Sequence, residues 1–137
     1  STLLHTLFPY TTLFRSGQIE FHQPVADIAA KYRDASLLVL PSRSEGFGMV
    51  LLEAMSLGTP CISFDCPSGP GDILTNGVDG ILVPPGDVVG LANAMDDLIN
   101  DPGTRKALAD QARISSRKYA IEEIAQRWHQ LFSGLVA

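Results

Sequence analysis

The feature of the sequence that most constrains the fold is an alternation of short apolar runs with longer segments of helical periodicity. The apolar runs Leu37–Leu40, Cys61–Phe64 and Gly80–Val83 are each four residues long. Runs of this length are typical of strands that are buried on both faces. Strands joined by helical crossovers predict an α/β fold, a parallel sheet with helices on both faces. Such sheets bind ligands at the carboxyl ends of their strands, so the loops after the three runs are the candidate site region.

Helices are predicted between and after these strands, from apolar periodicity and from the residues that start and stop helices. Gly58 lies where the helix before the second strand is expected to end, and Asp101-Pro102-Gly103 is expected to break the helical C-terminal part. A further short strand is predicted at Ile19–His22. The predicted helices are about Pro24–Asp34, Gly48–Leu57, Asp72–Thr75, Val88–Asn100, Thr104–Ser116 and Ile121–Phe132.

The first sixteen residues read unlike the rest of the chain. Residues 1–16 are rich in Thr, Leu and Phe, carry one charge at Arg15, and follow no clear period. The string looks like a translated sequencing adapter, which would place the start of the natural sequence near Gly17. A genuine edge strand is the alternative. We therefore expect residues 1–16 to be non-native or disordered and residues 17–137 to form one domain.

Composition and charge exclude several classes of function. The net charge is −5 and the ten Lys and Arg residues are scattered, so no basic stripe for nucleic acid is present. Cys61 and Cys66 complete no zinc pattern and are expected to be reduced thiols. No apolar run approaches the roughly 20 residues that span a bilayer, and no signal-peptide pattern is seen. The expected location is the cytoplasm.

The segment after the first strand carries the most informative chemistry. Gly46 and Gly48 flank Phe47, which allows the backbone to approach a ligand closely. The N–H groups at the start of the following helix have no intrahelical partners and would face the same point. Together with the helix dipole they predict an anion site at this loop.

Two acidic residues belong to the same segment. Glu53 has Met49, Val50, Ser56 and Leu57 as its neighbours on the predicted helix, so its carboxylate is expected to have little water. Two adjacent hydroxyls of a ribose would satisfy it. The alternatives are a helix-rim position that reaches solvent or a pair with a distant arginine. For the other acid, Glu45, the alternative is an acid near the helix N-cap that complements the dipole.

The combination of these features resembles a known family. Glu45 and Glu53 are separated by seven residues, and Gly-Phe-Gly follows the first acid. This pattern resembles the E-x7-E signature of the group 1 family of retaining glycosyltransferases, and the similarity covers about residues 17–132. The resemblance implies the GT-B fold of two facing Rossmann-like domains, of which this chain would be the C-terminal, nucleotide-sugar-binding one. The similar segments are LPS at 40–42, EGFG at 45–48, EAM at 53–55, GTPCI at 58–62 and GILVPPGD at 80–87.

The resemblance implies a role for each matching residue. Glu45 would lie beside the donor sugar, near the reacting centre, and is the candidate catalytic residue. The amides of the glycine-flanked loop would hold the sugar, those at the helix start would face the phosphate and ribose, and Glu53 would bind the ribose hydroxyls. The candidate substrate-binding residues are thus Gly46, Phe47, Gly48, Met49, Val50 and Glu53.

The implied reaction transfers a hexosyl group from a nucleoside-diphosphate sugar to an acceptor hydroxyl, with retention, in polysaccharide or glycolipid biosynthesis. The family needs no metal or other cofactor, and Asp96-Asp97 is read as a solvated pair on a helix. The cations that neutralise the diphosphate would lie upstream of Gly17, and the acceptor site in an N-terminal domain that is missing here. His5, His22 and His129 match no family position. The isolated fragment is therefore expected to be inactive, and peripheral association of the full enzyme with a membrane is left open.

Three other functions remain open from the residues alone. The first is another enzyme of the same architecture, such as a sugar phosphorylase, synthase or epimerase. The second is a non-catalytic module that binds a nucleotide sugar or a partner. A flavodoxin-like regulatory domain is the third, with Asp65 as a loosely fitting phosphorylation site. The loop Asp65–Asp72 is a secondary site candidate, in which Ser68 or Asp72 would reach the cleft or would instead form a cap or turn.

Overall fold

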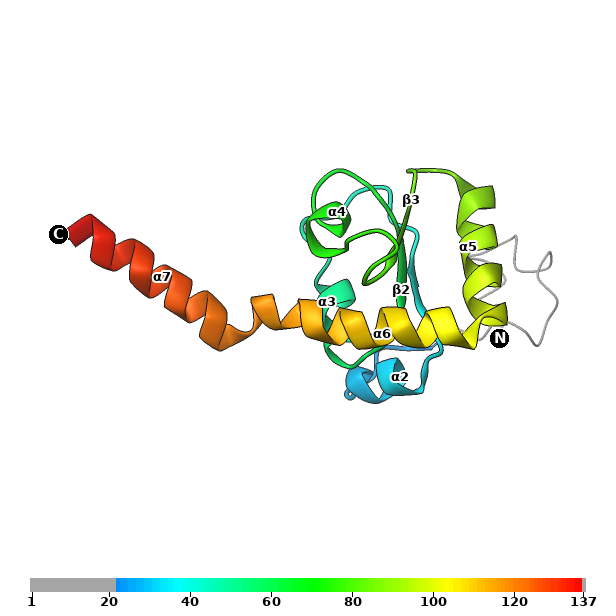
Figure 1. Cartoon of the computed structure of the whole chain (residues 1–137), viewed down its shortest axis with the longest axis horizontal. Coiled ribbons are helices and arrows are strands. Elements are labelled where there is room, and N and C mark those ends of the chain that lie inside the picture. The colour runs from blue at the N-terminus through cyan, green and yellow to red at the C-terminus, as the bar shows by residue number, and fades with distance from the viewer. Residues whose placement is uncertain (1–21, 137) are drawn as a thin grey trace.

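Three parallel strands form the sheet, and each comes from one of the predicted apolar runs. They are β1 (Leu38–Leu40), β2 (Cys61–Phe64) and β3 (Ile81–Val83), with the spatial order β1-β2-β3. Helices cover both faces of the sheet (Figure 1). The predicted α/β class and the parallel sheet are therefore confirmed.

The computed structural model describes residues 22–136 of the chain. The predicted non-native segment, residues 1–16, lies outside this range, as does most of the strand expected at Ile19–His22. The helices of the described part are α2 (Ile28–Asp34), α3 (Met49–Ser56), α4 (Pro70–Ile73), α5 (Val88–Asn100), α6 (Pro102–Ser116), the short 3-10 helix η2 (Arg117–Tyr119) and α7 (Ile121–Val136). None of them is long and apolar enough to cross a membrane.

Two early helices are shorter or shifted relative to the prediction. The helix expected from Pro24 begins at Ile28, because the side chain of Asp27 caps it by accepting a hydrogen bond from the Ala30 N–H at 3.1 Å. The helix expected at Asp72–Thr75 instead spans α4, and the chain leaves it after Ile73.

The C-terminal helices also differ at their ends. The carboxylate of Asp101 accepts a hydrogen bond from the Thr104 N–H at 3.0 Å, and Pro102 occupies the first turn of α6. The predicted break between α5 and α6 is therefore present at Asp101, but α6 begins at Pro102 and not at Thr104, because proline is tolerated in the first turn of a helix. Helix α7 continues past the predicted end at Phe132 to Val136.

The central strand is buried on both of its faces. Cys61, Ile62 and Ser63 are fully buried and Phe64 is 5% exposed. Because successive side chains of a strand point to opposite faces, Cys61 belongs to a cluster with buried residues of α3, whereas Ile62 and Phe64 pack with Leu91 and other residues of α5 and α6. The sheet is therefore held between two apolar layers.

The two cysteines, which the sequence predicted to be reduced thiols, are free and both are buried. Burial, with a smaller contribution from the nearby charge of Asp79, raises the pKa of the Cys61 thiol to about 12. A thiol with such a pKa is a weak nucleophile at neutral pH. Cys61 therefore serves as a small apolar side chain of the core.

Adjacent residues of α5 provide a test of this packing. Leu98 is 3% exposed and lies in the cluster between α5 and the sheet, whereas Ile99 is 52% exposed. Leu98→Ala is expected to lower the free energy of unfolding by about 2–5 kcal/mol, and Ile99→Ala to change it by no more than about 0.5 kcal/mol. Urea unfolding of the chain, followed by circular dichroism, measures both; equal losses would contradict this packing of α5.

Candidate functional site

The loop between β1 and α3 lies at the carboxyl edge of the sheet, where the sequence placed the site. Gly48 is the N-cap of α3 and has a φ of +92°, a left-handed conformation that favours glycine. No side chain caps the first turn of α3, so the N–H groups of Met49 and Val50 are not covered by a capping group. Such a helix start can receive an anionic group.

A second glycine brings the loop after β2 against this one. Gly69 is buried, has a φ of +108°, and a Cβ at its position would overlap the carbonyl oxygen of Phe47. Glycine at this position is therefore required both by the backbone conformation and by the close approach of Phe47. Gly46 differs from Gly69. A Cβ at Gly46 would have no atom within 4 Å apart from the adjacent residues, and its φ is not in the left-handed region.

The ring of Phe47 also packs against Tyr119, at the end of η2. The two rings meet edge to face, with centroids 5.8 Å apart and planes at 75°, a favourable aromatic geometry. The Tyr119 hydroxyl donates a hydrogen bond to the carbonyl oxygen of Asp72 at 2.8 Å. Two segments that are distant in the sequence, the loop after β2 and η2, thus contact Phe47.

The secondary candidate loop lines a hollow of about 340 Å³ at the ends of β2 and β3. The carboxylate of Asp72 accepts a hydrogen bond from the Gly69 N–H at 3.3 Å, and Ser68 has a φ of 65°. Asp72 therefore has the capping role that the sequence left open as an alternative. The Ser68 backbone is in a conformation that is uncommon for a side-chain-bearing residue.

The surroundings of Glu53 differ from the prediction. Its side chain is exposed, not deprived of water. The reason is that α3 packs on the sheet through its other side, where Leu51, Ala54 and Met55 are fully buried, while Met49 is 57% exposed. The Tyr32 hydroxyl donates a hydrogen bond to Oε2 of Glu53 at 3.1 Å.

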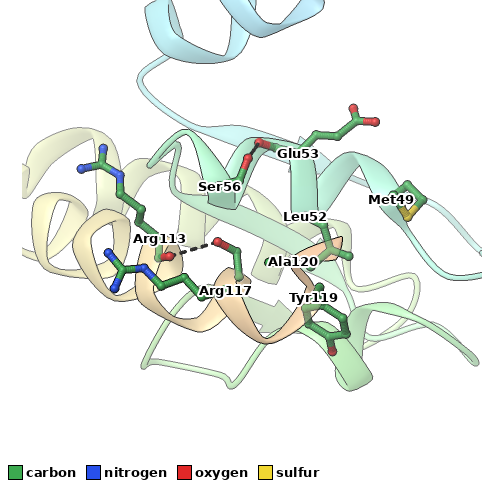
Figure 2. A pocket seen from close by; sticks show the side chains of 9 residues that line it. Met49, Leu52, Glu53, Ser56, Arg113, Arg117, Tyr119 and Ala120 are labelled. Carbon is green, nitrogen blue, oxygen red and sulfur yellow. Dashed lines mark hydrogen bonds between the residues drawn. The ribbon is translucent and has the colours of Figure 1, made fainter. Parts of the chain in front are cut away.

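Glu53 and Met49 border a pocket of about 400 Å³ between α3 and the α6–η2 segment (Figure 2). Arg113 and Arg117 line the same pocket, but the carboxylate of Glu53 points away from their guanidinium groups. No ion pair joins Glu53 to a residue of the described range 22–136. Of the two alternatives, the helix-rim position describes Glu53 in this structure, and the pair with a distant arginine is absent.

Glu45 is half-buried in the loop before α3. Within residues 22–136 it forms neither a hydrogen bond nor an ion pair. The N-cap of α3 is Gly48, so Glu45 does not cap this helix. Glu45 lines neither of the two hollows described above. Of the remaining candidates, Val50 is half-buried against the core beneath α3.

Two tyrosines of the site escaped the sequence analysis. Neither Tyr32 nor Tyr119 was singled out as a candidate. Tyr32 lies 21 positions from its partner Glu53, and Tyr119 lies 47 positions from Asp72. No local pattern indicates such distant partners. Among the described residues, no group of three or more His, Cys, Asp or Glu side chains lies close enough to hold a metal ion.

Comparison with known proteins relates the chain to one family. The family Glycosyl transferases group 1 matches residues 12–115. An exopolysaccharide phosphotransferase of Streptomyces coelicolor is 37% identical over 120 residues, which cover 87% of this chain and 13% of that protein. The similarity therefore concerns a small part of that longer relative.

Solved structures give the same relation. The Anabaena protein HepE in complex with UDP superposes with a TM-score of 0.85 and 27% identity, over 97% of this chain and 36% of HepE. The C-terminal domain of a group 1 glycosyl transferase from Francisella tularensis gives a TM-score of 0.70 and 28% identity, over 88% of this chain and 62% of that one. The fold is that of the C-terminal half of a GT-B protein, and the chain belongs to the group 1 glycosyl transferases.

Proposed function

We propose that this chain is the donor-binding part of a retaining glycosyltransferase. The complete enzyme would transfer a hexosyl group from a nucleoside-diphosphate sugar to an acceptor hydroxyl. The observation that carries the proposal is the uncapped start of α3 at the carboxyl edge of the sheet, with an exposed acid, Glu53, on the same helix. The binding of UDP by the structural neighbour HepE supports a nucleotide ligand of this kind.

The nucleotide end of the donor would lie along α3. The N–H groups of Met49 and Val50 would donate hydrogen bonds to the diphosphate, which the helix dipole also favours. The exposed carboxylate of Glu53 would accept hydrogen bonds from the ribose hydroxyls. Bonds to a charged acceptor contribute about 1.5–3 kcal/mol each, so this one acid would supply much of the selectivity for a ribonucleotide.

The sugar end would lie over the Gly46–Gly48 loop. The open space around Gly46 supports this placement, because no neighbour in the described chain explains a glycine there. A sugar that approaches the backbone would explain it. Glu45, which has no partner among residues 22–136, would contact sugar hydroxyls beside the reacting carbon.

In the proposed reaction the bond between the anomeric carbon and the diphosphate oxygen breaks, and the diphosphate leaves with the electron pair. The acceptor oxygen forms the new bond to that carbon, and its proton passes to the departing diphosphate. Negative charge grows on the departing diphosphate, so stabilisation of that charge dominates the barrier. The N–H groups at the start of α3 would supply part of this stabilisation, and cationic side chains outside the described residues would supply the rest.

An exposed apolar row on α7 supports the presence of a further domain. Helix α7 projects away from the sheet and its helices (Figure 1). Several large apolar side chains exposed together on one helix mark a surface that another protein surface covers. The chain spans 36% of HepE. We propose that an N-terminal, acceptor-binding domain covers this row. The row comprises Ile121, Trp128, Leu131, Phe132 and Leu135, each more than half exposed.

Calorimetric titration of the complete enzyme with UDP and GDP, and with their sugars, tests the proposal. Turnover with retention is then read from the anomeric configuration of the product by NMR. Binding without turnover on any acceptor would favour the alternative, a non-catalytic nucleotide-sugar-binding module. No binding of any nucleotide sugar would contradict the proposal itself.

The cytoplasmic location expected from the sequence stays a prediction.

Glu53→Ala in the complete enzyme is expected to weaken nucleotide binding by about 10- to 100-fold, because one or two charge-assisted hydrogen bonds to the ribose are lost. Calorimetry with the preferred nucleoside diphosphate measures the change. Asp97→Ala, which removes an exposed acid from α5, is the matched control and should leave the affinity unchanged. Unchanged affinity in Glu53→Ala would remove the ribose role.

Glu45→Gln is expected to lower kcat by roughly 100-fold, the scale at which a positioned catalytic group contributes, and to change nucleotide affinity much less. Steady-state kinetics and calorimetry on the same preparation separate the two effects. If Glu45→Gln weakened nucleotide binding while kcat stayed at the wild-type value, the position of Glu45 beside the sugar would be wrong.

Gly46→Ala tests whether the sugar approaches the backbone at Gly46, in a variant whose fold should be undisturbed. Because the space around Gly46 is open, the added methyl group should leave the unfolding midpoint unchanged or slightly raised. The same methyl group would displace the bound sugar, so kcat/KM for the donor should fall roughly 10- to 100-fold. Thermal unfolding and initial rates are the two measurements, and wild-type kinetics in the variant would place the sugar elsewhere.

A further inference from the structure

Tyr32 is fixed in the core at a point where its hydroxyl reaches the proposed ribose-binding acid. The side chain is 8% exposed and packs in the cluster beneath α3, with Leu52 among its members. Its backbone carbonyl accepts a hydrogen bond from the Thr59 hydroxyl at 2.7 Å. Tyr32 is thus held by packing around its ring and by a buried hydrogen bond to its backbone.

Glu53 is in the opposite situation. Its side chain is exposed, has three rotatable bonds and forms no ion pair within residues 22–136. An exposed glutamate of this kind samples several rotamers, and a ligand must select one of them at an entropic cost. The hydrogen bond from the Tyr32 hydroxyl to Oε2, at 3.1 Å, links the exposed carboxylate to a side chain held in the core.

We infer that Tyr32 is a positioning residue for ribose recognition: it holds one oxygen of Glu53 and leaves the other oxygen oriented toward the ribose hydroxyls. This inference rests on the proposed function of Glu53. A carboxylate can accept several hydrogen bonds, so the phenol and a ribose hydroxyl can be bound together. Preorganisation of this kind raises affinity because less freedom is lost on binding.

The protonation of Tyr32 fits the same role. Burial, and then the hydrogen bond to Glu53, raise the pKa of the Tyr32 phenol. The phenol therefore stays protonated and acts as a donor throughout the neutral range. At every pH in the neutral range, the hydrogen bond therefore keeps its direction, from the Tyr32 hydroxyl to the Glu53 carboxylate.

Tyr32→Phe removes the hydroxyl and keeps the ring, and a pair of nucleotides reports on ribose recognition alone. The complete enzyme is titrated with UDP, GDP and ADP, and the tightest of these is compared with its 2′,3′-dideoxy analogue. The wild-type protein is expected to bind the ribonucleotide at least about 10-fold more tightly. Tyr32→Phe should weaken ribonucleotide binding roughly 3- to 10-fold and leave binding of the dideoxy analogue unchanged.

Two controls separate this role from a structural one. Thr104→Val removes a side-chain hydroxyl that donates a hydrogen bond to Asp101 at the start of α6, and the ratio of the two affinities should stay at its wild-type value. In a Glu53→Ala background, Tyr32→Phe should have no further effect on that ratio. In steady-state kinetics, Tyr32→Phe should raise the donor KM and leave kcat unchanged.

The outcomes distinguish failure of the inference from failure of the proposed function. If the wild-type protein binds the ribonucleotide and its dideoxy analogue equally, the ribose role of Glu53 is wrong and the inference falls with it. If the wild-type protein discriminates and Tyr32→Phe retains the same ratio, only the inference is wrong. Equal weakening of both ligands by Tyr32→Phe would indicate a general structural effect and would also overturn it.

Discussion

The burial of β2 on both faces is the constraint on which the rest of the domain depends. A strand without an exposed side needs an apolar layer above and below, and α3 and α5 supply those layers. The backbone of β2 is paired with β1 on one side and with β3 on the other, so this central strand offers little to a ligand. What is left for chemistry is the carboxyl edge, where loops leave the sheet and α3 begins.

The loops at that edge are shaped by contacts between segments that are distant in the sequence. Gly69 must lack a side chain because the carbonyl of Phe47 occupies the space, and Tyr119 packs against the Phe47 ring from η2. The shape of the proposed sugar loop therefore depends on a residue about twenty positions later and on one about seventy positions later. The E-x7-E segment does not determine its own geometry.

The sequence predicted the strands and helices well because their limits are set by local chemistry. Pro41 follows β1 directly, and Gly58 follows the end of α3 with a φ of +77°. The errors at helix starts arose where an aspartate cap, Asp27 or Asp101, defined the first turn. The position of the candidate loop at the sheet edge was also predictable, because parallel topology alone places it there.

The exposure of the Glu53 side chain could not be predicted in the same way. Its helix is apolar nearly all round, so the sequence does not reveal which side of α3 meets the sheet. Packing decides this: the fully buried Leu51 and Met55 face inward, which turns Glu53 outward beside the exposed Met49. An exposed carboxylate is open to a ligand but poorly ordered. A buried phenol from a neighbouring helix can restore the order without closing the site, and Tyr32 has the position and the protonation state that this requires.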